Sequence, residues 1–522
     1  LDGETDGASV SLVVTDPEGY AVYEGPAAGD TIEIEGIQPW SHAAPVLYHA
    51  VLTLRDADGV LQEVVPYDIG FRRFEMINGV MCLNGERVVF NGVNRHEWNA
   101  DRGRAIGADD MHAAMAVFKK NNINAVRTCH YPDQSLWYDL CDKNGIYMID
   151  ETNLESHGSW QKLGAIEPSW NVPGSLPEWK DCVVDRARSM LERDKNHAAV
   201  LIWSCGNESY AGEDILAMTQ FFHAKDPSRL VHYEGVVHNR AFAAITDMES
   251  RMYTTVNEIR EFLSKDRRKP YVCCEYAHAM GNSCGAMKKY MDLAEEEPLF
   301  QGGFIWDFAD KAIAIHEEDG NIKYGYGGAF GEDVTDPVPD MCLNGVVFAD
   351  LSYKPGAYEV RNGQSPVTIE QVKNPYTGET IWVLANRYHT LDLSHLQVRY
   401  EIVQNGETLA KGSYPAFYTA AGTTETLPLP ELPAKLHGEA YVNYYVELAQ
   451  DTFYAPAGTE LYRRQIPVTS GVYLADEKTI VGKPLTVSRM KIMFASPAKR
   501  PKLSLIKRQV NLPDIRQRAF LL

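Results

Sequence analysis

Two glutamates that follow apolar runs are the residues of this sequence best suited to acid–base chemistry. Glu208 follows the apolar stretch 200–203, and Glu275 follows the stretch 271–274. A carboxylate at the end of a buried strand lies at the mouth of a parallel sheet, partly shielded from water. Two such carboxylates in one site can divide into a proton donor and a nucleophile, the minimum needed to cleave a glycosidic bond. A lone glutamate in this position would more often be a surface residue or a helix cap.

Polar residues at the ends of other predicted strands support a shared site. A single histidine there is more often a structural residue that has satisfied its hydrogen bonds. Polar groups at seven of eight strand ends are hard to explain by packing, because apolar residues or glycine would avoid the desolvation cost. The polar strand ends are Asn94–Glu97, Thr128–Tyr131, Asp150–His157, Asn207 and Glu208, Met252 and Tyr253, Glu275–His278, and Trp306 and Asp307.

These side chains suit a sugar ring, which has an apolar face and a polar rim. Trp306 can stack on the face, although a core aromatic is the alternative interpretation of this residue. Hydrogen bonds to the hydroxyl groups can come from His96, His130, Asn207 and His278. The pattern therefore predicts a carbohydrate site at the strand ends.

A candidate metal site lies in the same region of the sequence. Glu155 and His157 are two residues apart, so an extended chain places both side chains on the same side. With Glu208 they form a mixed oxygen and nitrogen set that can hold Mg²⁺ through a few ligands and several waters. A hydrogen-bond network without a metal is the alternative. No Cys/His cluster has the spacing of a zinc finger.

The elements that must position these residues alternate between strands and helices. The predicted strands are 88–93, 124–128, 147–149, 200–204, 230–233, 247–253, 271–274 and 303–306. The predicted helices between them are 109–121, 135–144, 180–193, 211–224, 256–264 and 285–296. Eight such units over this length match a (β/α)8 TIM barrel, with a doubly wound open sheet as the main competitor.

The segments on either side of the barrel are rich in β-forming residues. We therefore predict a multidomain α/β plus all-β chain, with a central barrel at 76–362 flanked by two immunoglobulin-like β-sandwiches at 1–75 and 363–468. The first sandwich is short for a complete one. Its predicted strands are 10–14, 31–34 and 46–54, and those of the second include 381–385, 398–403 and 441–448. The basic tail 469–522 has no fold that we can assign.

Composition limits the classes of partner. The formal net charge of −21 over 522 residues argues against a nucleic-acid partner, which would favour a basic face. We find no run of about 18 apolar residues, so no membrane span or membrane partner is expected. The nine cysteines lack a regular framework, and the N-terminus has no basic-then-apolar signal pattern. Reduced thiols in a cytoplasmic protein are the simplest interpretation.

At these motifs the chain resembles the large bacterial β-galactosidases of glycoside hydrolase family 2. The resemblance runs from about residue 10 to 470 and is densest across the barrel. The stretch 275–282, Glu-Tyr-Ala-His-Ala-Met-Gly-Asn, separates this branch from the related β-glucuronidases and β-mannosidases. The other matching stretches are 92–97, 124–127, 130–132, 150–151, 155–158, 203–209 and 301–307.

The resemblance implies a retaining exo-β-galactosidase that acts on terminal β-galactose in lactose-like substrates. It implies Glu275 as the nucleophile, Glu208 as the acid/base, and Tyr253 as a hydrogen-bond partner of the nucleophile. The implied substrate-binding residues are His96, His130, Asn207, Met252, Tyr253, His278 and Trp306. The implied metal ligands are Glu155, His157 and Glu208 for Mg²⁺, and Asn344 as a candidate for Na⁺.

The sequence also departs from the family pattern. Met341 stands where the family has a gating phenylalanine beside the sodium ligand. The family's N-terminal jelly-roll and large C-terminal β-sandwich are not in the printed sequence, so we expect a more open pocket, lower turnover and self-association into a homo-oligomer. Another retaining exo-β-glycosidase, such as a β-glucuronidase, is one alternative, but no Arg or Lys motif for a sugar carboxylate is evident. A catalytically weak galactoside-binding or assembly fragment of a larger enzyme is the other.

Overall fold

A parallel sheet of eight strands forms the centre of the protein. In order, the strands are β8 (Phe90–Arg95), β9 (Ala125–Thr128), β10 (Tyr147–Glu151), β11 (Val200–Ser204), β12 (Leu230–His232), β13 (Glu249–Met252), β14 (Tyr271–Tyr276) and β15 (Phe300–Ile305). Neighbours in the sheet are mostly neighbours in sequence, and the last strand pairs with the first, β15 with β8. This cyclic strand order confirms the barrel prediction, and the open doubly wound sheet is wrong. The computed structural model describes residues 6–27, 31–160, 172–333, 341–374, 376–388, 390–469 and 471.

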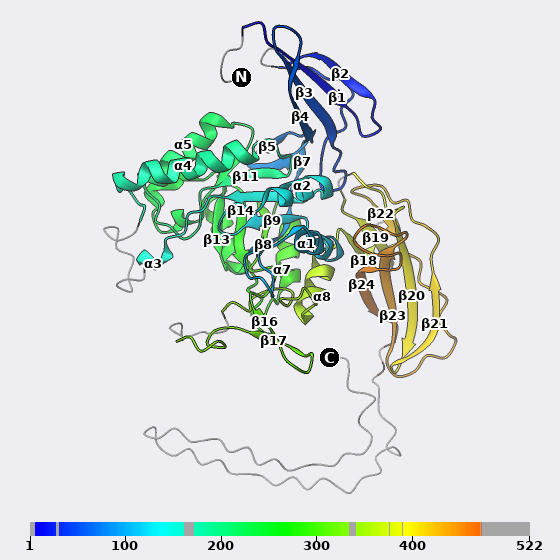
Figure 1. The fold of residues 1–522 in the computed structure, drawn as a ribbon. Helices are drawn as coiled ribbons and strands as arrows, with labels where there is room; N and C mark the ends of the chain where they lie inside the picture. The colour runs from blue at the N-terminus through cyan, green and yellow to red at the C-terminus, as the bar shows by residue number, and fades with distance from the viewer. Residues whose placement is uncertain are drawn as a thin grey trace, which may run out of the picture. The chain divides into compact units, whose positions relative to one another are not determined.

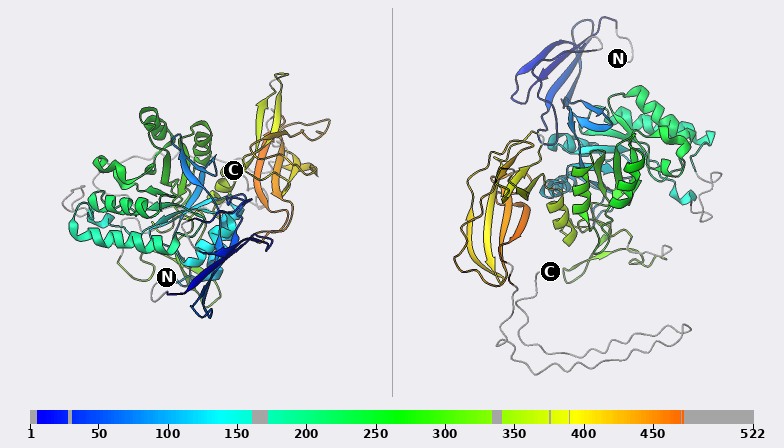
Figure 2. Two further views of the ribbon diagram at one scale, coloured as in Figure 1. Left: turned by 90° about the horizontal axis from the view of Figure 1, so that it is seen from above. Right: turned by 180° about the vertical axis from the view of Figure 1, so that it is seen from behind.

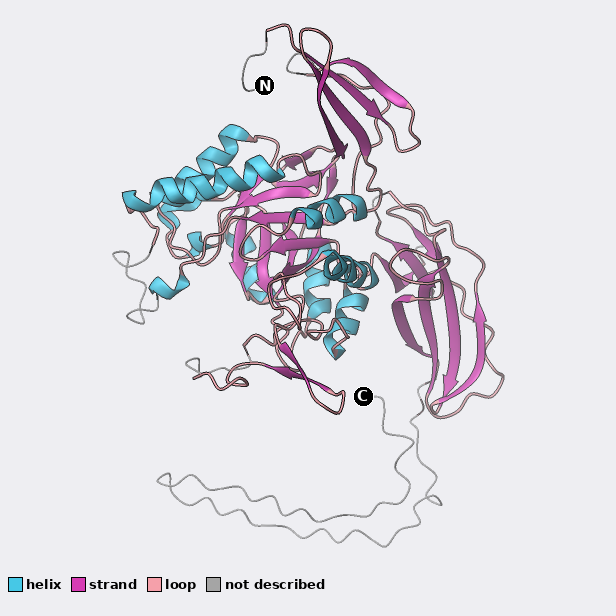
Figure 3. Cartoon of the chain, viewed as in Figure 1, coloured by secondary structure: helices cyan, strands magenta, loops and turns pink. Residues whose placement is uncertain are grey.

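Most residues of the barrel strands are buried because the two faces of each strand are covered, one by the barrel interior and the other by helices. Every residue of β9, β11, β14 and β15 is buried. Helices surround these strands in Figures 1 and 3. They are α1 (Ala108–Lys120), α2 (Ser135–Asn144), α4 (Pro177–Asp194), α5 (Glu213–Lys225), α6 (Val256–Lys265), α7 (Met287–Glu296) and α8 (Pro355–Gly363).

Local sequence explains where individual helices begin and end. Thr255 accepts a hydrogen bond from the backbone N–H of Glu258, whose side chain accepts one in return, and this capping box begins α6. Ile259 and Leu263 then lie four residues apart on the buried face of that helix. Gly145 ends α2 in the left-handed conformation, with φ of 67°.

Several elements differ from the sequence-based expectation. The link from β12 to β13 contains two short 3₁₀ helices, η2 (Gly235–Val237) and η3 (Arg240–Ile245). After β15 a hairpin forms from β16 (Ile313–His316) and β17 (Ile322–Gly325), and this hairpin was not predicted. A four-residue helix, α3 (His157–Trp160), begins at His157, one of the predicted metal ligands.

The N-terminal segment is a four-stranded antiparallel sheet with the order β2-β1-β3-β4. Its strands are β1 (Ser9–Thr15), β2 (Ala21–Pro26), β3 (Tyr48–Arg55) and β4 (Leu61–Ile69). The strand predicted at 31–34 is wrong, because these residues form irregular chain. Ile34 packs against the small core around Val14 and Tyr48 without joining a ladder, so its apolar side chain imitated a strand signal. A small sheet of β5 (Phe74–Ile77), β6 (Val80–Leu83) and β7 (Glu86–Arg87) leads into the barrel.

The C-terminal segment is a two-sheet antiparallel sandwich with its own core, seen from two further directions in Figure 2. One sheet has β18 (Val367–Lys373), β19 (Thr380–Asn386) and β22 (Thr424–Thr426). The other has β21 (Glu407–Ser413), β20 (Leu396–Gln404), β23 (Ala440–Leu448) and β24 (Glu460–Pro467). The predicted strands 381–385, 398–403 and 441–448 lie within β19, β20 and β23.

Two expectations concern regions or properties outside these sheets. Apart from Thr469 and Gly471, the basic tail 469–522 lies outside the described residues. Within the described ranges, no helix combines the length and the apolar character needed to cross a membrane.

Candidate active site

Arg127 at the end of β9 is the centre of the polar network at the strand ends. Its guanidinium group is fully buried and donates to Glu151 Oε2 at 2.7 Å and to Glu275 Oε1 at 3.0 Å. The same group donates to Asn207 Oδ1 at 2.8 Å. Burial would raise the pKa of Glu151, but Arg127 and His130 outweigh it and lower that pKa to about 2. One buried cation therefore holds side chains from β10, from β14 and from the loop after β11.

Glu275 has both carboxylate oxygens engaged. Oε1 accepts from Arg127 at 3.0 Å, and Oε2 accepts from the hydroxyl of Tyr253 at 2.7 Å. The residue is buried, with 4 % exposure, and is the second-last residue of strand β14. Burial, followed by the charge of Glu275, raises the pKa of Tyr253, so the phenol keeps its proton and donates it. These contacts fix the Glu275 carboxylate in one orientation.

Glu208 has a different environment from Glu275. Burial raises the pKa of Glu208 to about 7, and the negative charges of Glu155 and Glu275 act in the same direction. Its backbone N–H donates to Glu234 Oε1 at 2.6 Å. The backbone of Glu208 is in the left-handed region with φ of 37°, an uncommon conformation that a surrounding structure must hold in place. Tyr253 shares this feature, with φ of 53°.

The predicted Mg²⁺ ligands come together in the structure. Donor atoms of Glu155, His157 and Glu208 all lie within 4.8 Å of one another. His157 Nδ1 is 3.0 Å from Glu208 Oε2, and Asn207 Nδ2 donates to Glu155 Oε2 at 2.7 Å. Two carboxylates and one imidazole, all partly open to solvent, leave room for the waters that Mg²⁺ retains. The donor set therefore fits this ion.

His96, His130 and Trp306 form an aromatic group beside the network. The His130 ring stacks on the Trp306 ring with centroids 5.3 Å apart, and the His96 ring meets Trp306 edge-on at 5.6 Å. His130 Nδ1 lies 2.7 Å from Glu151 Oε1, and His96 Nδ1 lies 3.1 Å from the hydroxyl of Tyr131. Each imidazole is therefore oriented through one nitrogen and has a second nitrogen for another partner.

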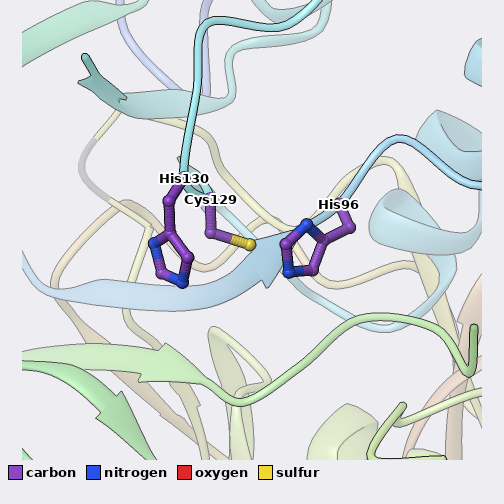
Figure 4. A group of neighbouring side chains, drawn as sticks. All are labelled: His96, Cys129 and His130. Atoms are coloured by element: carbon purple, nitrogen blue, oxygen red, sulfur yellow. The ribbon is translucent and has the colours of Figure 1, made fainter. Parts of the chain in front are cut away.

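Cys129 lies between these two imidazoles, and the three side chains converge in Figure 4. Its sulfur and a ring nitrogen from each of His96 and His130 lie within 4.8 Å of one another. Burial, followed by the charge of Lys311, holds the pKa of His96 well below its ordinary value. The positive charges of Lys311 and Arg127 oppose a further cation here, so we do not assign a metal centre to this group.

Met252, Tyr253 and His278 complete the predicted sugar-binding set. Met252 and Glu208 line a cavity of about 400 Å³. Tyr253 is 47 % exposed, and its ring lies 5.8 Å from that of His278. Burial lowers the pKa of His278, which favours the neutral imidazole. These residues therefore line the open side of the network around Glu275.

Asn344 does not have the surroundings of a sodium ligand. The ammonium of Lys311 donates to Asn344 Oδ1 at 2.8 Å and also to the carboxylate of Asp307. Asn344 and Asp307 are both buried. A cation of the chain itself therefore occupies the oxygen atoms that an alkali ion would need, and these residues do not fit a sodium site.

Several residues of this network were not assigned a role from the sequence. Arg127 and Glu151 had a recognisable signal, because each is a charged residue near the end of a buried barrel strand. Glu234 follows β12 in the same way and is buried beside Glu208. Lys311 had no comparable signal, because it lies beyond the end of β15, in a loop of no fixed pattern.

The fold and this network define a class of TIM-barrel proteins with paired carboxylates at the strand ends, and family comparisons agree. Residues 74–369 match the family described as "Glycosyl hydrolases family 2, TIM barrel domain". Residues 2–72 match "Glycosyl hydrolases family 2", and residues 383–469 match "Beta-galactosidase, domain 4". The barrel match alone covers more than half of the 522 residues. The chain belongs to glycosyl hydrolase family 2.

Curated relatives share high sequence identity with the chain. The β-galactosidase of Halalkalibacterium halodurans is 48 % identical over 424 residues, which is 81 % of this chain and 41 % of that protein. The β-galactosidase of Clostridium acetobutylicum is 46 % identical over 464 residues, 88 % of this chain and 50 % of that protein. The β-galactosidase large subunit of Lactobacillus acidophilus is 49 % identical over 362 residues, 67 % of this chain and 57 % of that protein. The chain thus spans about half the length of the curated relatives it matches.

Solved structures resemble the chain at lower identity. A Ruminococcus gnavus β-glucuronidase superposes with a TM-score of 0.55 at 20 % identity, covering 69 % of this chain and 64 % of that one. A β-glucuronidase from Dictyoglomus thermophilum superposes with a TM-score of 0.52 at 19 % identity, covering 68 % and 64 %. At this identity the likeness supports the fold alone.

Proposed function

We propose that the protein is a retaining exo-β-galactosidase that removes terminal β-D-galactose from lactose-like substrates. The observation that carries this proposal is the unequal environment of two strand-end carboxylates. Glu275 is held by Arg127 and Tyr253, which each donate a hydrogen bond to one of its carboxylate oxygens. Burial, followed by the negative charges of Glu155 and Glu275, raises the pKa of Glu208 and favours its protonated form. Carboxylates separated in this way suit the roles of nucleophile and acid.

In the first half of the reaction, a Glu275 oxygen attacks the anomeric carbon of the sugar. Glu208 gives its proton to the glycosidic oxygen as the bond to the aglycone breaks, and the aglycone leaves as an alcohol. The sugar is then an ester of Glu275. Arg127 and Tyr253 position the attacking carboxylate for this step, because they fix both of its oxygens.

In the second half, Glu208 acts as a base. It takes a proton from a water molecule, and the resulting oxygen attacks the anomeric carbon and displaces the Glu275 carboxylate. One water is consumed, Glu208 regains its proton, and two inversions give net retention. A retaining site needs carboxyl groups about 5–5.5 Å apart, whereas an inverting site needs about 6.5–9.5 Å to hold a water between them.

Glu155, His157 and Glu208 would hold Mg²⁺ in this proposal. When bound, the ion supplies a positive charge that orients the carboxylate of Glu208 and balances its negative neighbours. Asn207 links this group to the nucleophile side of the site, since its amide donates to Glu155 and accepts from Arg127. Loss of the ion would therefore alter the acid/base residue more than the nucleophile.

Galactose is the proposed sugar because the curated relatives are named β-galactosidases. The sugar's apolar face would lie against the free side of Trp306, and its hydroxyl groups would bond the free imidazole nitrogens of His96 and His130. Asn207 and His278 would bond further hydroxyls, while Met252 borders the aglycone side. These assignments explain why polar side chains occupy the strand ends.

The test is cleavage of nitrophenyl β-glycosides by the purified chain, with the product followed by ¹H NMR. We expect cleavage of the β-galactoside at a rate well above those of the β-glucoside and β-glucuronide, and β-galactose as the first anomer released. A Glu275→Gln variant should lose this activity and serves as the control for contaminating enzyme. An α-galactose first product, or a preference for the glucuronide, would contradict the proposal.

A further inference from the structure

Lys311 places a positive charge beside Trp306, a residue of the candidate sugar site. Its ammonium donates to Asn344 Oδ1 at 2.8 Å and to the carboxylate of Asp307. The Lys311 side chain is only 14 % exposed, and that of Asp307 is 1 % exposed. An ammonium has three N–H donors and no acceptor, and the third donates to the carbonyl of Ala309 at 3.5 Å. This bond is long, so a sugar hydroxyl at a shorter distance can replace it.

The backbone fixes the position of this ammonium. The N–H of Lys311 donates to the carbonyl of Cys342 at 2.9 Å, and the N–H of Asp307 donates to the carbonyl of Asn344 at 2.7 Å. These bonds join the loop after β15 to the segment that carries Asn344. Gly345 permits this close approach, because a Cβ atom there would lie 2.2 Å from the backbone nitrogen of Asp310. The charge is thus held in place before any ligand binds.

Lys311 acts on the same residues that are proposed to bind the sugar. Its Nζ lies 5.8 Å from the centroid of the Trp306 ring. Its charge adds to burial in lowering the pKa values of His96 and His278. The ammonium is therefore close to the Trp306 ring, and its charge also acts on His96 and His278.

We propose that Lys311 is a fixed cation of the terminal-sugar site, which donates a hydrogen bond to a sugar hydroxyl and takes the place of an alkali-metal ion. This inference rests on the proposed galactosidase function. A sodium ion at Asn344 would lie next to the Lys311 ammonium, which has no acceptor atom to offer as a ligand. Two positive charges this close together repel strongly in a partly buried site. Binding of the sugar is therefore independent of Na⁺ and K⁺ in this chain.

The neighbouring Asp307 determines what kind of sugar suits this cation. Its carboxylate pairs with Lys311, so the two residues together carry no net charge. Asp307 is buried, and its second oxygen, Oδ1, has no surface open to a ligand. Because Asp307 balances the charge of Lys311, the pair offers little net attraction to the carboxylate of a uronic acid. The pair therefore selects a neutral sugar.

The test compares the wild-type chain with Lys311→Gln and with Lys354→Gln as a matched control. Lys354 is a second buried lysine, whose Nζ donates to Asp310 Oδ1 at 2.6 Å and to the carbonyl of Leu343 at 3.1 Å. Binding of isopropyl β-thiogalactoside is measured by calorimetry in NaCl and in choline chloride at equal ionic strength. Sodium binding is measured separately through the ²³Na NMR linewidth.

We expect equal affinity of the wild-type chain in both salts and no broadening of the ²³Na signal. Lys311→Gln should bind about tenfold more weakly in choline chloride, the effect of losing one hydrogen bond to a charged group, and should recover part of that loss in NaCl with ²³Na broadening. Lys354→Gln should show no sodium response. A severalfold gain in wild-type affinity with Na⁺, or unchanged binding by Lys311→Gln, would overturn the proposal.

Two further outcomes separate this inference from the proposed function. If the wild-type chain neither binds nor cleaves a galactoside, the proposed function fails, while the ²³Na measurement on the wild-type chain still decides whether Lys311 replaces the ion. Efficient cleavage of nitrophenyl β-galacturonide would contradict the selection of a neutral sugar. The wild-type salt comparison requires no variant, so a Lys311→Gln protein that fails to fold leaves the inference testable.

Discussion

Glu208 and Glu275 lie in one network but have different hydrogen-bond partners. Both oxygens of Glu275 accept hydrogen bonds, from Arg127 and from Tyr253. Glu208 instead lies beside His157, and burial, followed by the charges of Glu155 and Glu275, raises its pKa to about 7. Because the partners differ, the two glutamates should respond differently to the same substitution.

Replacing Glu208 with glutamine should slow substrates with poor leaving groups far more than activated ones. A poor leaving group needs the proton that Glu208 supplies, and general acid catalysis contributes about 10²–10⁴-fold. The measurement is kcat/KM for lactose and for dinitrophenyl β-galactoside. Glu275→Gln is the comparison, since loss of the nucleophile should reduce kcat/KM for both substrates alike. Equal losses on both substrates in Glu208→Gln would remove Glu208 from the acid role.

The buried imidazole of His232 should make the free energy of unfolding decrease in mild acid. The residue is fully buried between the hydroxyls of Ser204 at 2.9 Å and Ser250 at 2.8 Å, and burial lowers its pKa to about 3. In the unfolded chain a histidine has a pKa of about 6.5, so between these values the unfolded state binds more protons. Stability is therefore complete above about pH 6.5 and falls as the pH decreases toward 3.

The corresponding measurement is the unfolding temperature from pH 8 to pH 5. Wild-type protein should lose stability over this range, and His232→Asn should show a smaller loss because the titrating group is gone. The exposed His112 provides the control, and His112→Asn should follow the wild-type curve. A His232→Asn curve parallel to that of the wild type would contradict this role for burial.

Residue identity could be predicted from sequence where a short motif marked a strand end. Glu208, Glu275, Glu155 and His157 were found in this way, and the structure places their side chains in one region. Lys311 was missed because its hydrogen bond to Asn344 joins two chain segments about 30 residues apart in the sequence. No local pattern records such a contact. Arg127 was part of a matching motif, but its role as the centre of five side-chain contacts exists only in three dimensions.

At the scale of elements, strand predictions succeeded where both faces of a strand are buried. Such strands are short continuous apolar runs, as in β11, whose bounds were predicted in full. Residues 31–34 alternate polar and apolar side chains like a half-buried strand, but Ile34 covers a small core outside any ladder. The short helices η2 and η3 were not predicted, because three to six residues carry little periodic signal.

Substitution of Gly302 in β15 tests how the barrel positions Trp306. Its φ is +85°, and a Cβ atom at this position would lie 2.2 Å from the carbonyl oxygen of Phe90 on the paired strand β8. Gly302→Ala should therefore push β15 from β8 and displace the residue that follows the strand. The left-handed backbone alone costs about 1–2 kcal/mol for a residue with a Cβ.

We expect Gly302→Ala to lower the midpoint of chemical unfolding and to weaken galactoside binding. Gly285 is the matched control, because a Cβ atom there meets nothing within 4 Å. Gly285→Ala should unfold at the wild-type midpoint. If both variants unfold like the wild type, the close contact between β15 and β8 does not determine the position of the site.

At the scale of the whole molecule, the β-sheet segments and the barrel have separate sources of stability. The barrel and the C-terminal sandwich each have an extensive apolar core, and the N-terminal sheet has a small one. The order of α/β and all-β segments could be predicted because hydrophobic periodicity changes at the boundaries. A β-sandwich was predicted for the N-terminal segment, although the segment is short for one. Its described residues form one four-stranded sheet.

Removal of Mg²⁺ should lower activity without unfolding the barrel. The proposed ligands lie on the open side of the site, with side-chain exposures of 40 % for His157 and 31 % for Glu208, away from the buried apolar core. Removal of the ion should misorient Glu208 but leave the apolar core buried. The rate of lactose hydrolysis and the thermal unfolding curve are measured with Mg²⁺, after EDTA treatment, and again after Mg²⁺ is restored. Unchanged rates in metal-free buffer would indicate a hydrogen-bond network instead of a metal site.

The central claim is that Glu275 forms a covalent bond to the sugar, and trapping of that bond tests it most directly. The wild-type chain is incubated with 2-deoxy-2-fluoro-β-galactosyl fluoride, which reacts in the first step and slows the second, and its peptides are analysed by mass spectrometry. We predict that the peptide containing Glu275 gains the mass of one fluorogalactosyl group and that Glu275→Gln gains none. A label on Glu208, or no label on a chain that still hydrolyses galactosides, would contradict the double-displacement mechanism.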